Sequence, residues 1–142
     1  MKVLFIGDIV GNPGRKAVKS VVPEMKRSLS IDYCIANCEN SAGGSGTTYA
    51  VAQELFDSGI DGITLGNHTW SKKDITNFLD TEIRIVRPAN YPQDLPGKGS
   101  TIINHEGKSP IGLLNLLGRV YMDGVECPFR TADREVQSLK NF

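Results

Sequence analysis

Polar side chains that can bind metal ions follow three apolar, strand-like segments of this sequence. The segments are residues 3–6, 33–36 and 63–65, and the polar residues after them are Asp8, then Glu39 and Asn40, then Asn67 and His68. In open α/β sheets, ligands bind in the crevice beyond the carboxyl ends of the strands. We therefore expect these five side chains to meet at one edge of a sheet.

The residue types suit a site for two metal ions. Asp8 and Glu39 supply hard anionic oxygens, and Glu39 can bridge two cations. Asn40 and Asn67 add carbonyl oxygens without adding charge. Two metals about 3.5 to 4 Å apart can bind a phosphate oxygen and a nucleophilic hydroxide, and a nearby His68 can donate a proton to the leaving alkoxide. The pattern predicts hydrolysis of a phosphate ester at a dimetal centre.

Each polar group also has an ordinary structural explanation when it is taken alone. Asp8 can cap or shape the glycine-rich turn that follows it. Glu39 with Asn40 can be a solvated turn, and Asn67 with His68 can be a turn with a hydrogen-bonded histidine. Because accident is a poor explanation for all three at successive strand ends, their joint occurrence favours the metal site.

The glycine-rich segments, His105 and Trp70 each allow more than one interpretation. Neither G-x-G-x-x-G nor G-x-x-x-x-G-K-[ST] occurs, which disfavours an ordinary nucleotide-binding domain. Gly43, Gly44 and Gly46 can form a backbone concavity for a phosphate, and a flexible loop explains them equally well. His105 is interpreted as structural, and Trp70 as a packing anchor that can also border the substrate.

Short apolar runs alternate with segments of helical periodicity, which is typical of parallel strands joined by crossover helices. Three helices are predicted: residues 17–25 with a weak point at Pro23, residues 51–59 after a Thr47 or Thr48 cap, and a helix after a Ser71 cap with Asp74 in the capping box. Residues 83–86 predict a fourth, shorter strand. An α/β domain spanning residues 1–142 is long enough to bury a core.

From residue 87 onward, prolines and glycines cluster and forbid regular structure up to residue 99. This loop is interpreted equally well as functional or as a cover. Residues 101–104 and 111–117 then predict an antiparallel hairpin, so we expect a mixed sheet flanked by helices. Ala132, Val136 and Leu139 mark one apolar face of a last helix, which is expected to run to Phe142.

Sixteen basic and sixteen acidic residues cancel in this chain of 142 residues. The broad attraction behind nonspecific nucleic-acid or anionic-membrane binding is therefore missing, and neither partner is expected. Cys34, Cys38 and Cys127 lack C-x-x-C spacing, which indicates free thiols in a reducing cytosol, with zinc ligation by Cys34 and Cys38 as the alternative. Neither a signal-peptide pattern nor an apolar run of about 18 residues occurs, so a cytoplasmic protein is expected.

Five segments of the sequence resemble one known family. They are residues 5–11 (FIGDIVG), 37–44 (NCENSAGG), 66–70 (GNHTW), 87–92 (RPANYP) and 96–99 (PGKG). The set resembles the calcineurin-like metallophosphoesterase superfamily, and specifically its bacterial YmdB-like branch, whose members act as 2′,3′-cyclic-nucleotide 2′-phosphodiesterases. Five segments together are far more specific than any single motif.

The resemblance implies a role for each strand-end residue. Asp8 and Asn40 would bind one metal, Glu39 would bridge, Asn67 would bind the second metal, and His68 would be the catalytic acid. It also implies iron or manganese ions and a small phosphodiester or cyclic-nucleotide substrate. The implied fold is a four-layer α/β-β/α sandwich of two sheets covered by helices.

Members of that family are longer and bring further histidine ligands, whereas only His68 and His105 occur here. We therefore expect a truncated chain, an incomplete metallophosphoesterase domain that supplies chiefly the first sheet and its helices and has low activity. An apolar sheet face without its normal cover is expected to self-associate into a homo-oligomer or aggregate. The alternative is a catalytically inactive phosphate- or nucleotide-binding or regulatory module.

Overall fold

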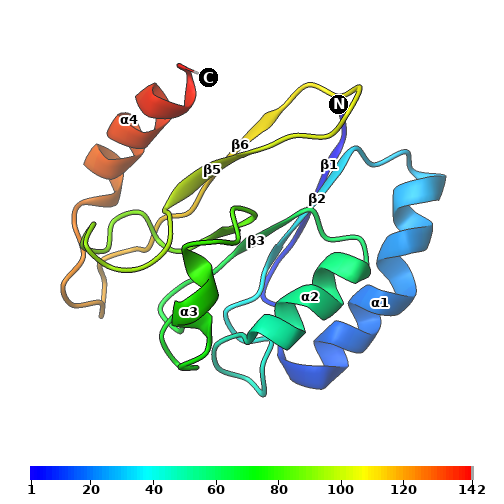
Figure 1. Cartoon of the computed structure of the whole chain (residues 1–142), viewed down its shortest axis with the longest axis horizontal. Helices are drawn as coiled ribbons and strands as arrows, with labels where there is room; N and C mark the ends of the chain where they lie inside the picture. Colours follow the sequence, from blue (N-terminus) through cyan, green and yellow to red (C-terminus); the bar gives the residue numbers. More distant parts are fainter. Residues whose placement is uncertain (142) are drawn as a thin grey trace.

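The computed structural model describes residues 1–141 and has an α/β fold around a four-stranded parallel sheet (Figure 1). The strands are β1 (Val3–Ile6), β2 (Tyr33–Asn37), β3 (Gly62–Thr64) and β4 (Ile85–Val86), hydrogen-bonded in that order. The crossover helices are α1 (Gly11–Ser28), α2 (Tyr49–Asp57) and α3 (Ile75–Leu79). The predicted alternation of strands and helices is confirmed.

The three crossover helices cover one face of the parallel sheet (Figure 1). Because side chains alternate along a strand, Cys34 and Ala36 of β2 point to this face. They are fully buried there together with Leu55 of α2 and Leu79 of α3. Burial of a large apolar side chain such as leucine contributes about 1.5 to 3 kcal/mol, so this cluster is the main core of the molecule.

The first crossover helix is longer than predicted. α1 begins at Gly11 and stays helical through Pro13 and Pro23. Pro13 lies in the first turn, where its missing N–H would have no intrahelical partner in any case. The weak point expected at Pro23 therefore does not end the helix.

The predicted caps of the next two helices have different outcomes. Thr48 caps α2, because its hydroxyl accepts a hydrogen bond from the Val51 amide at 3.2 Å. Ser71 does not cap α3, which begins after Asp74. The Asp74 carboxylate instead accepts the Tyr49 amide at 3.3 Å, in the first turn of α2. Asp74 thus stabilises a neighbouring helix rather than its own.

β5 (Ser100–Ile103) and β6 (Ile111–Leu114) form the predicted antiparallel hairpin, but as a separate second sheet. Ile103 and Leu113 of the hairpin pack on Tyr33 and Ile35 of β2, on the face opposite to the helices. Gly62 permits this close approach, because a Cβ there would collide with Ile103. The predicted mixed sheet is therefore wrong, since the apolar face of the hairpin is buried across the parallel sheet instead of extending its edge.

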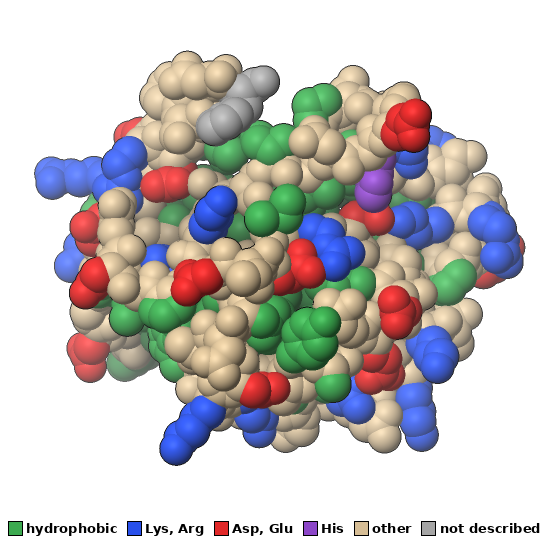
Figure 2. All heavy atoms as spheres, in the orientation of Figure 1, with side chains coloured by type: hydrophobic (Ala, Val, Ile, Leu, Met, Phe, Trp, Pro, Cys, Tyr) green, Lys and Arg blue, Asp and Glu red, His purple; other side chains and the backbone are tan. Residues whose placement is uncertain are grey.

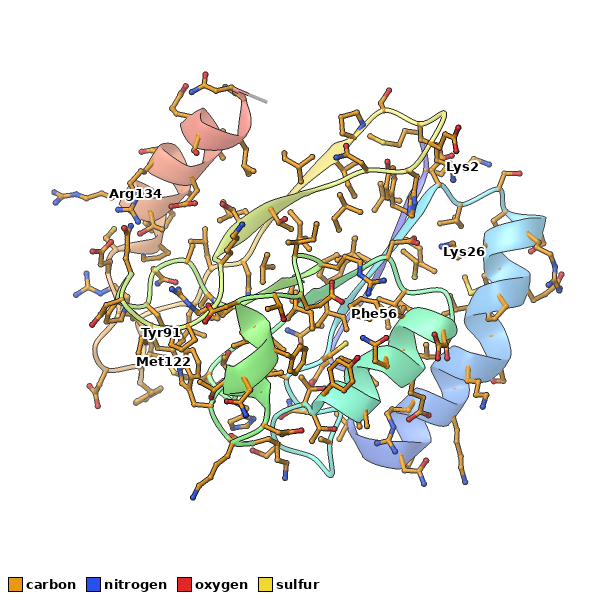
Figure 3. All side chains as sticks on the ribbon, viewed as in Figure 1. Lys2, Lys26, Phe56, Tyr91, Met122 and Arg134 are labelled. Carbon is orange, nitrogen blue, oxygen red and sulfur yellow. The ribbon has the colours of Figure 1, made fainter. Side chains whose placement is uncertain are left out.

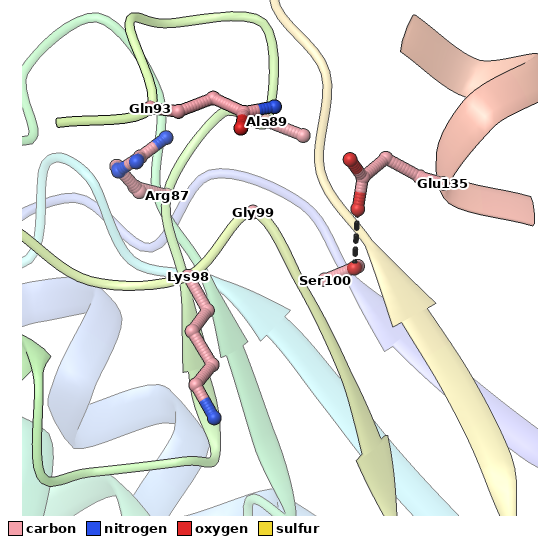
Figure 4. A pocket seen from close by; sticks show the side chains of 7 residues that line it. All are labelled: Arg87, Ala89, Gln93, Lys98, Gly99, Ser100 and Glu135. Atoms are coloured by element: carbon pink, nitrogen blue, oxygen red, sulfur yellow. Dashed lines mark hydrogen bonds between the residues drawn. The ribbon is translucent and has the colours of Figure 1, made fainter. Parts of the chain in front are cut away.

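α4 (Pro128–Leu139) covers the outer face of the hairpin. Leu139 lies over Gly112 of β6, and Ser100 Oγ of β5 donates a hydrogen bond to Glu135 Oε2 at 2.7 Å (Figure 4). Crossover helices, parallel sheet, hairpin and α4 therefore follow one another as layers (Figure 1).

The apolar face predicted for α4 only partly contacts the hairpin. Leu139 is half-buried, whereas Val136 is 39% exposed, and the fully buried residue of this helix is Thr131. The helix ends at Leu139. The predicted end at Phe142 lies outside the described residues.

The proline- and glycine-rich segment from residue 87 to residue 99, here called the Arg87 loop, is organised by its first side chain. The Arg87 guanidinium is buried and donates at 2.9 to 3.1 Å to three backbone oxygens of the loop itself, those of Pro88, Leu95 and Pro96. A buried charge requires such partners. The loop is irregular, as predicted, and its course is defined by these bonds.

The hairpin covers only part of its face of the parallel sheet. By register, Val3 and Phe5 of the edge strand β1 point to the same face as Tyr33 and Ile35, yet they are 48% and 59% exposed. The predicted lack of cover therefore holds for β1 but not for β2. Self-association through this face stays a prediction.

The charged side chains do not segregate by sign on the face that Figure 2 shows, where Lys and Arg alternate with Asp and Glu. This distribution agrees with the balanced composition of the chain. Within residues 1–141, no helix has the length and apolar character that crossing a membrane requires.

The three cysteines are free thiols, as predicted. Cys34 and Cys38 are buried in the core, and zinc ligation by these two residues stays the alternative prediction. Burial raises the pKa of the Cys34 thiol to about 11 and also raises that of Cys38. Cys127 instead precedes α4, where hydrogen bonds from the Arg130 and Phe129 amides lower the pKa of its thiol.

We predict that a thiol reagent such as dithionitrobenzoate modifies Cys127 rapidly in the folded chain and leaves Cys34 and Cys38 unmodified, because the thiolate is the nucleophile. The rate should fall as the pH decreases through the lowered pKa of Cys127. Reagent consumption should rise from one thiol per chain to all three cysteines on denaturation. Cys127→Ser should remove the rapid phase, and rapid labelling of that variant would contradict the assignment.

Candidate metal centre

The parallel register brings the loops after β1, β2 and β3 to one edge of the sheet. Backbone hydrogen bonds join these neighbouring loops. The Ile9 amide donates to the Asn37 oxygen at 3.0 Å, and the Cys38 amide donates to the Thr64 oxygen at 2.9 Å. These hydrogen bonds therefore fix the backbone of the loops that carry the predicted site residues.

Asn40 connects Asp8 to His68. Its Nδ2 donates to Asp8 Oδ1 at 2.8 Å, and its Oδ1 lies 2.6 Å from His68 Nδ1. Because an ionised carboxylate only accepts hydrogen bonds, the amide nitrogen must face Asp8 and the amide oxygen must face His68. His68 consequently carries a proton on Nδ1, and Nε2 is the ring nitrogen left for other partners.

Glu39 joins this group through the backbone of the third loop. The His68 amide donates to Glu39 Oε2 at 3.1 Å. The Glu39 carboxylate lies against Gly66, and a Cβ on Gly66 would overlap it. The missing side chain of Gly66 therefore creates the space that Glu39 occupies.

Asp8 has a backbone φ of +22°. Residues other than glycine seldom adopt positive φ, although aspartate does so more readily than most. This conformation accompanies a side chain that reaches across to Asn40. The turn-forming and metal-binding interpretations of Asp8 are therefore compatible.

The structure brings Asp8, Glu39, Asn40 and His68 together, but it leaves Asn67 outside their hydrogen-bonded group, with an exposed side chain. Among residues 1–141, no three His, Cys, Asp or Glu side chains converge in a way that could hold a metal ion. The Asp8 carboxylate contacts the Asn40 amide, whereas Glu39 reaches this group only through the His68 backbone amide. Carboxylate and amide oxygens are the donor types that suit a hard divalent cation. The metal-ligand roles stay predictions.

Sequence reasoning missed two residues that shape this edge, Gly66 and Asn37. The Asn37 amide nitrogen donates to the Leu65 oxygen at 3.3 Å, whereas its Oδ1 is buried without a hydrogen-bond partner among the described residues. Such an atom is costly unless water or a ligand pairs with it. The sequence feature that could have identified Asn37 is its position at a strand end, two residues before Glu39.

The glycine-rich loop after Asn40 is held from its inner side. Arg15 Nη1 donates to the Ser41 oxygen at 2.7 Å, and the buried hydroxyl groups of Ser41 and Thr47 are hydrogen-bonded at 2.9 Å. Gly43 and Gly44 have φ values of +75° and +91°, and the space where a Cβ would lie is open at both. The outer side of this loop therefore remains accessible to a ligand.

A separate cavity of about 280 Å³ lies between the Arg87 loop and α4 (Figure 4). Arg87 and Glu135 line it, but both side chains already have partners, in the loop and on Ser100 respectively. None of the strand-end residues lines this cavity. This cavity is therefore separate from the candidate metal centre at the sheet edge.

Comparison with known proteins identifies relatives of this chain. A family model described as YmdB-like protein matches residues 4–142. The 2′,3′-cyclic-nucleotide 2′-phosphodiesterase of Bacillus subtilis (strain 168) is 46% identical over 133 residues, covering 94% of this chain and 50% of that protein.

Two solved structures are similar in fold. A hypothetical protein from Thermus thermophilus has a TM-score of 0.88 and 38% identity, over 96% of this chain and 53% of its own. A novel phosphatase from Mycoplasma pneumoniae has a TM-score of 0.86 and 28% identity, over 97% and 51%. The chain thus spans about half the length of the relatives that it matches.

We predict that Gly66→Ala displaces the Glu39 carboxylate and breaks its hydrogen bond with the His68 amide. Overpacking of this kind costs about 1 to 3 kcal/mol, so the free energy of unfolding in a denaturant titration should fall by that amount. Gly7→Ala is the matched control, because Gly7 also follows a parallel strand and a Cβ there meets no atom within 4 Å. Equal stability of the two variants would refute the fit between Gly66 and Glu39.

Proposed function

We propose, because the chain belongs to the YmdB-like family, that it takes part in metal-dependent hydrolysis of phosphodiesters. The proposed substrates are 2′,3′-cyclic nucleotides, the class in the name of the Bacillus subtilis relative. The observation that carries the proposal is the hydrogen-bonded group of Asp8, Asn40, His68 and Glu39. Because the chain spans half of that relative, the activity of the whole protein is part of the proposal.

Two divalent ions, iron or manganese, are the proposed cofactors. Asp8 and Asn40 would hold one ion, Asn67 the other, and Glu39 would bridge them. When bound, the ions would polarise the phosphate and lower the pKa of a water molecule. The support is the donor set from three neighbouring loops. Asn40 Oδ1 has two lone pairs, so it can accept the proton of His68 Nδ1 and still offer electrons to a cation.

The proton for the leaving group is assigned to His68. Hydrolysis at the 2′ position breaks the bond between phosphorus and the 2′ oxygen, and that oxygen must gain a proton as it leaves. Asp8 orients Asn40, and Asn40 occupies Nδ1 of His68, which directs Nε2 of the ring toward other partners. A protonated Nε2 would supply the proton, and a water molecule would supply the new oxygen on phosphorus.

Residues 1–142 are proposed to belong to one domain of the metallophosphoesterase sandwich. The order of layers, with crossover helices, parallel sheet, hairpin and α4 in succession, supports this proposal. The exposed Val3 and Phe5 on the edge strand support self-association as a further expectation.

A catalytically inactive phosphate- or nucleotide-binding or regulatory module is the second candidate. It is favoured by the absence, among residues 1–141, of three convergent His, Cys, Asp or Glu side chains. These residues alone should bind metal weakly, and the turnover of the 142-residue chain should be low. Two metal ions per chain would favour the enzyme, and one or none would favour the module.

We predict that Glu39→Gln weakens manganese binding by at least about tenfold and abolishes any hydrolysis of adenosine 2′,3′-cyclic phosphate, because it removes the anionic bridge. Calorimetric titration with manganese and chromatography of the nucleotide products measure both effects. Glu106→Gln is the matched control, since Glu106 is an exposed glutamate in the hairpin loop. Manganese affinity that survives Glu39→Gln would rule out the bridging role.

We predict that His68→Ala slows hydrolysis by about 10² to 10⁴ for substrates with poor leaving groups, and by much less for nitrophenyl esters, while manganese affinity stays unchanged. Rates should be compared in this chain and at the matching position of the Bacillus subtilis relative. His105→Ala, the other histidine of the chain, should leave the rates unaltered. Equal losses for good and poor leaving groups would show that His68 binds metal or substrate instead of donating a proton.

A further inference from the structure

Trp70 is held at a fixed position next to the candidate metal centre. It follows His68 by two residues in a turn where Thr69 is buried, and Thr69 Oγ1 donates to the Gly66 oxygen at 2.6 Å. The Ser71 amide donates to the His68 oxygen at 3.1 Å. Trp70 packs against the main core, and its side chain remains half-buried. The turn that presents His68 therefore also presents an indole ring.

Tyr91 reaches the same place from the Arg87 loop. Its ring centroid lies 6.4 Å from that of Trp70, at an interplanar angle of 65°. Such edge-to-face geometry is a favourable aromatic pairing. Tyr91 is also half-buried, so the two rings together form a partly exposed aromatic surface, here called the aromatic pair.

The loop that carries Tyr91 is braced on both sides of it. Arg87 binds the backbone oxygens of the loop, as described above. Asn90 is fully buried, and its amide nitrogen donates to the Leu117 and Glu126 oxygens at 2.7 and 3.1 Å. These hydrogen bonds fix the course of the loop, and they therefore also fix the position of Tyr91.

The aromatic pair lies on the side of the molecule where the metal ligands are proposed. Burial, and then the negative charge of Glu39, raise the pKa of the Tyr91 phenol, which keeps its proton at neutral pH. Tyr91 lies far from Lys2 and Lys26 in Figure 3, at the opposite end of the view. Lys2 precedes β1, and Lys26 pairs with Asp61 just before β3, so these lysines mark the amino-terminal edge of the sheet.

We propose that the aromatic pair Trp70–Tyr91 is the stacking surface for the base of a nucleotide whose phosphate lies at the candidate metal centre. The location of the phosphate rests on the proposed function, whereas the affinity of the pair for a base does not. Every nucleobase has a π-face, so stacking tolerates all four bases and favours purines through their larger area. The pair would distinguish nucleotides from phosphodiesters that carry no base.

The test uses Trp70 as its own reporter, because it is the only tryptophan of the chain. Adenosine 2′,3′-cyclic phosphate is titrated into the metal-free 142-residue chain while tryptophan emission is recorded. We expect saturable quenching by this nucleotide, weaker binding of the cytidine analogue, and none by ribose 5-phosphate at the same concentrations. Quenching by ribose 5-phosphate equal to that by the adenosine compound would overturn the proposal.

Variants of Tyr91 separate stacking from packing. Tyr91→Leu keeps an apolar side chain of substantial size but removes the ring, and loss of one stacking aromatic should weaken nucleotide binding by about 5- to 150-fold. Tyr91→Phe keeps the ring and should bind within about threefold of the parent chain. Phe129→Ala removes an exposed ring of α4 and is the control, with unchanged binding expected. Unaltered affinity of Tyr91→Leu would overturn the proposal, and far-ultraviolet circular dichroism checks that each variant is folded.

The outcomes distinguish this proposal from the hydrolytic function. Quenching that depends on Tyr91, in a chain that binds no manganese, would support the aromatic pair and count against the metal centre. Manganese-dependent hydrolysis by this chain without base-dependent quenching would overturn the aromatic pair and leave the metal centre standing.

Discussion

The amide of Asn40 is the interaction on which the candidate site depends. Its side chain contacts both the first loop, through Asp8, and the third loop, through His68. Its two ends are chemically different, so the acceptor at Asp8 determines which end faces the histidine, and this in turn determines which ring nitrogen carries the proton. Through Asn40, the Asp8 carboxylate after β1 thereby influences which tautomer of the His68 imidazole is present after β3.

The second sheet supports this edge from the other side. Asn115, directly after β6, donates through its amide nitrogen to the Leu65 oxygen at 2.7 Å and to the Val86 oxygen at 3.3 Å. Leu65 immediately precedes Gly66, the residue whose missing side chain makes room for Glu39. The hairpin therefore covers the apolar face of β2 and also helps to position the loop that carries His68.

Much of the architecture follows from local features of the sequence. The alternation of short apolar runs with helical periodicity depends on residues that are neighbours in the chain, which is why β1, β2, β3 and their crossover helices were predicted. Parallel strands place their carboxyl ends at one edge, so the meeting of Asp8, Glu39, Asn40 and His68 was also predictable from topology. The hairpin was predictable from its short loop, but the face of the parallel sheet against which it packs was not.

The sequence by itself therefore determined which elements form and which polar residues reach the shared edge, because periodicity and strand direction are local properties. Only the tertiary structure decided that the hairpin packs across the sheet as a second layer, that Asp74 serves α2 instead of capping α3, and that Tyr91 lies beside Trp70. The tertiary structure also decided the orientation of the Asn40 amide and the fit of Glu39 over Gly66. Each of these features depends on contacts between residues that are distant in the chain, and no local pattern encodes the partner of such a contact.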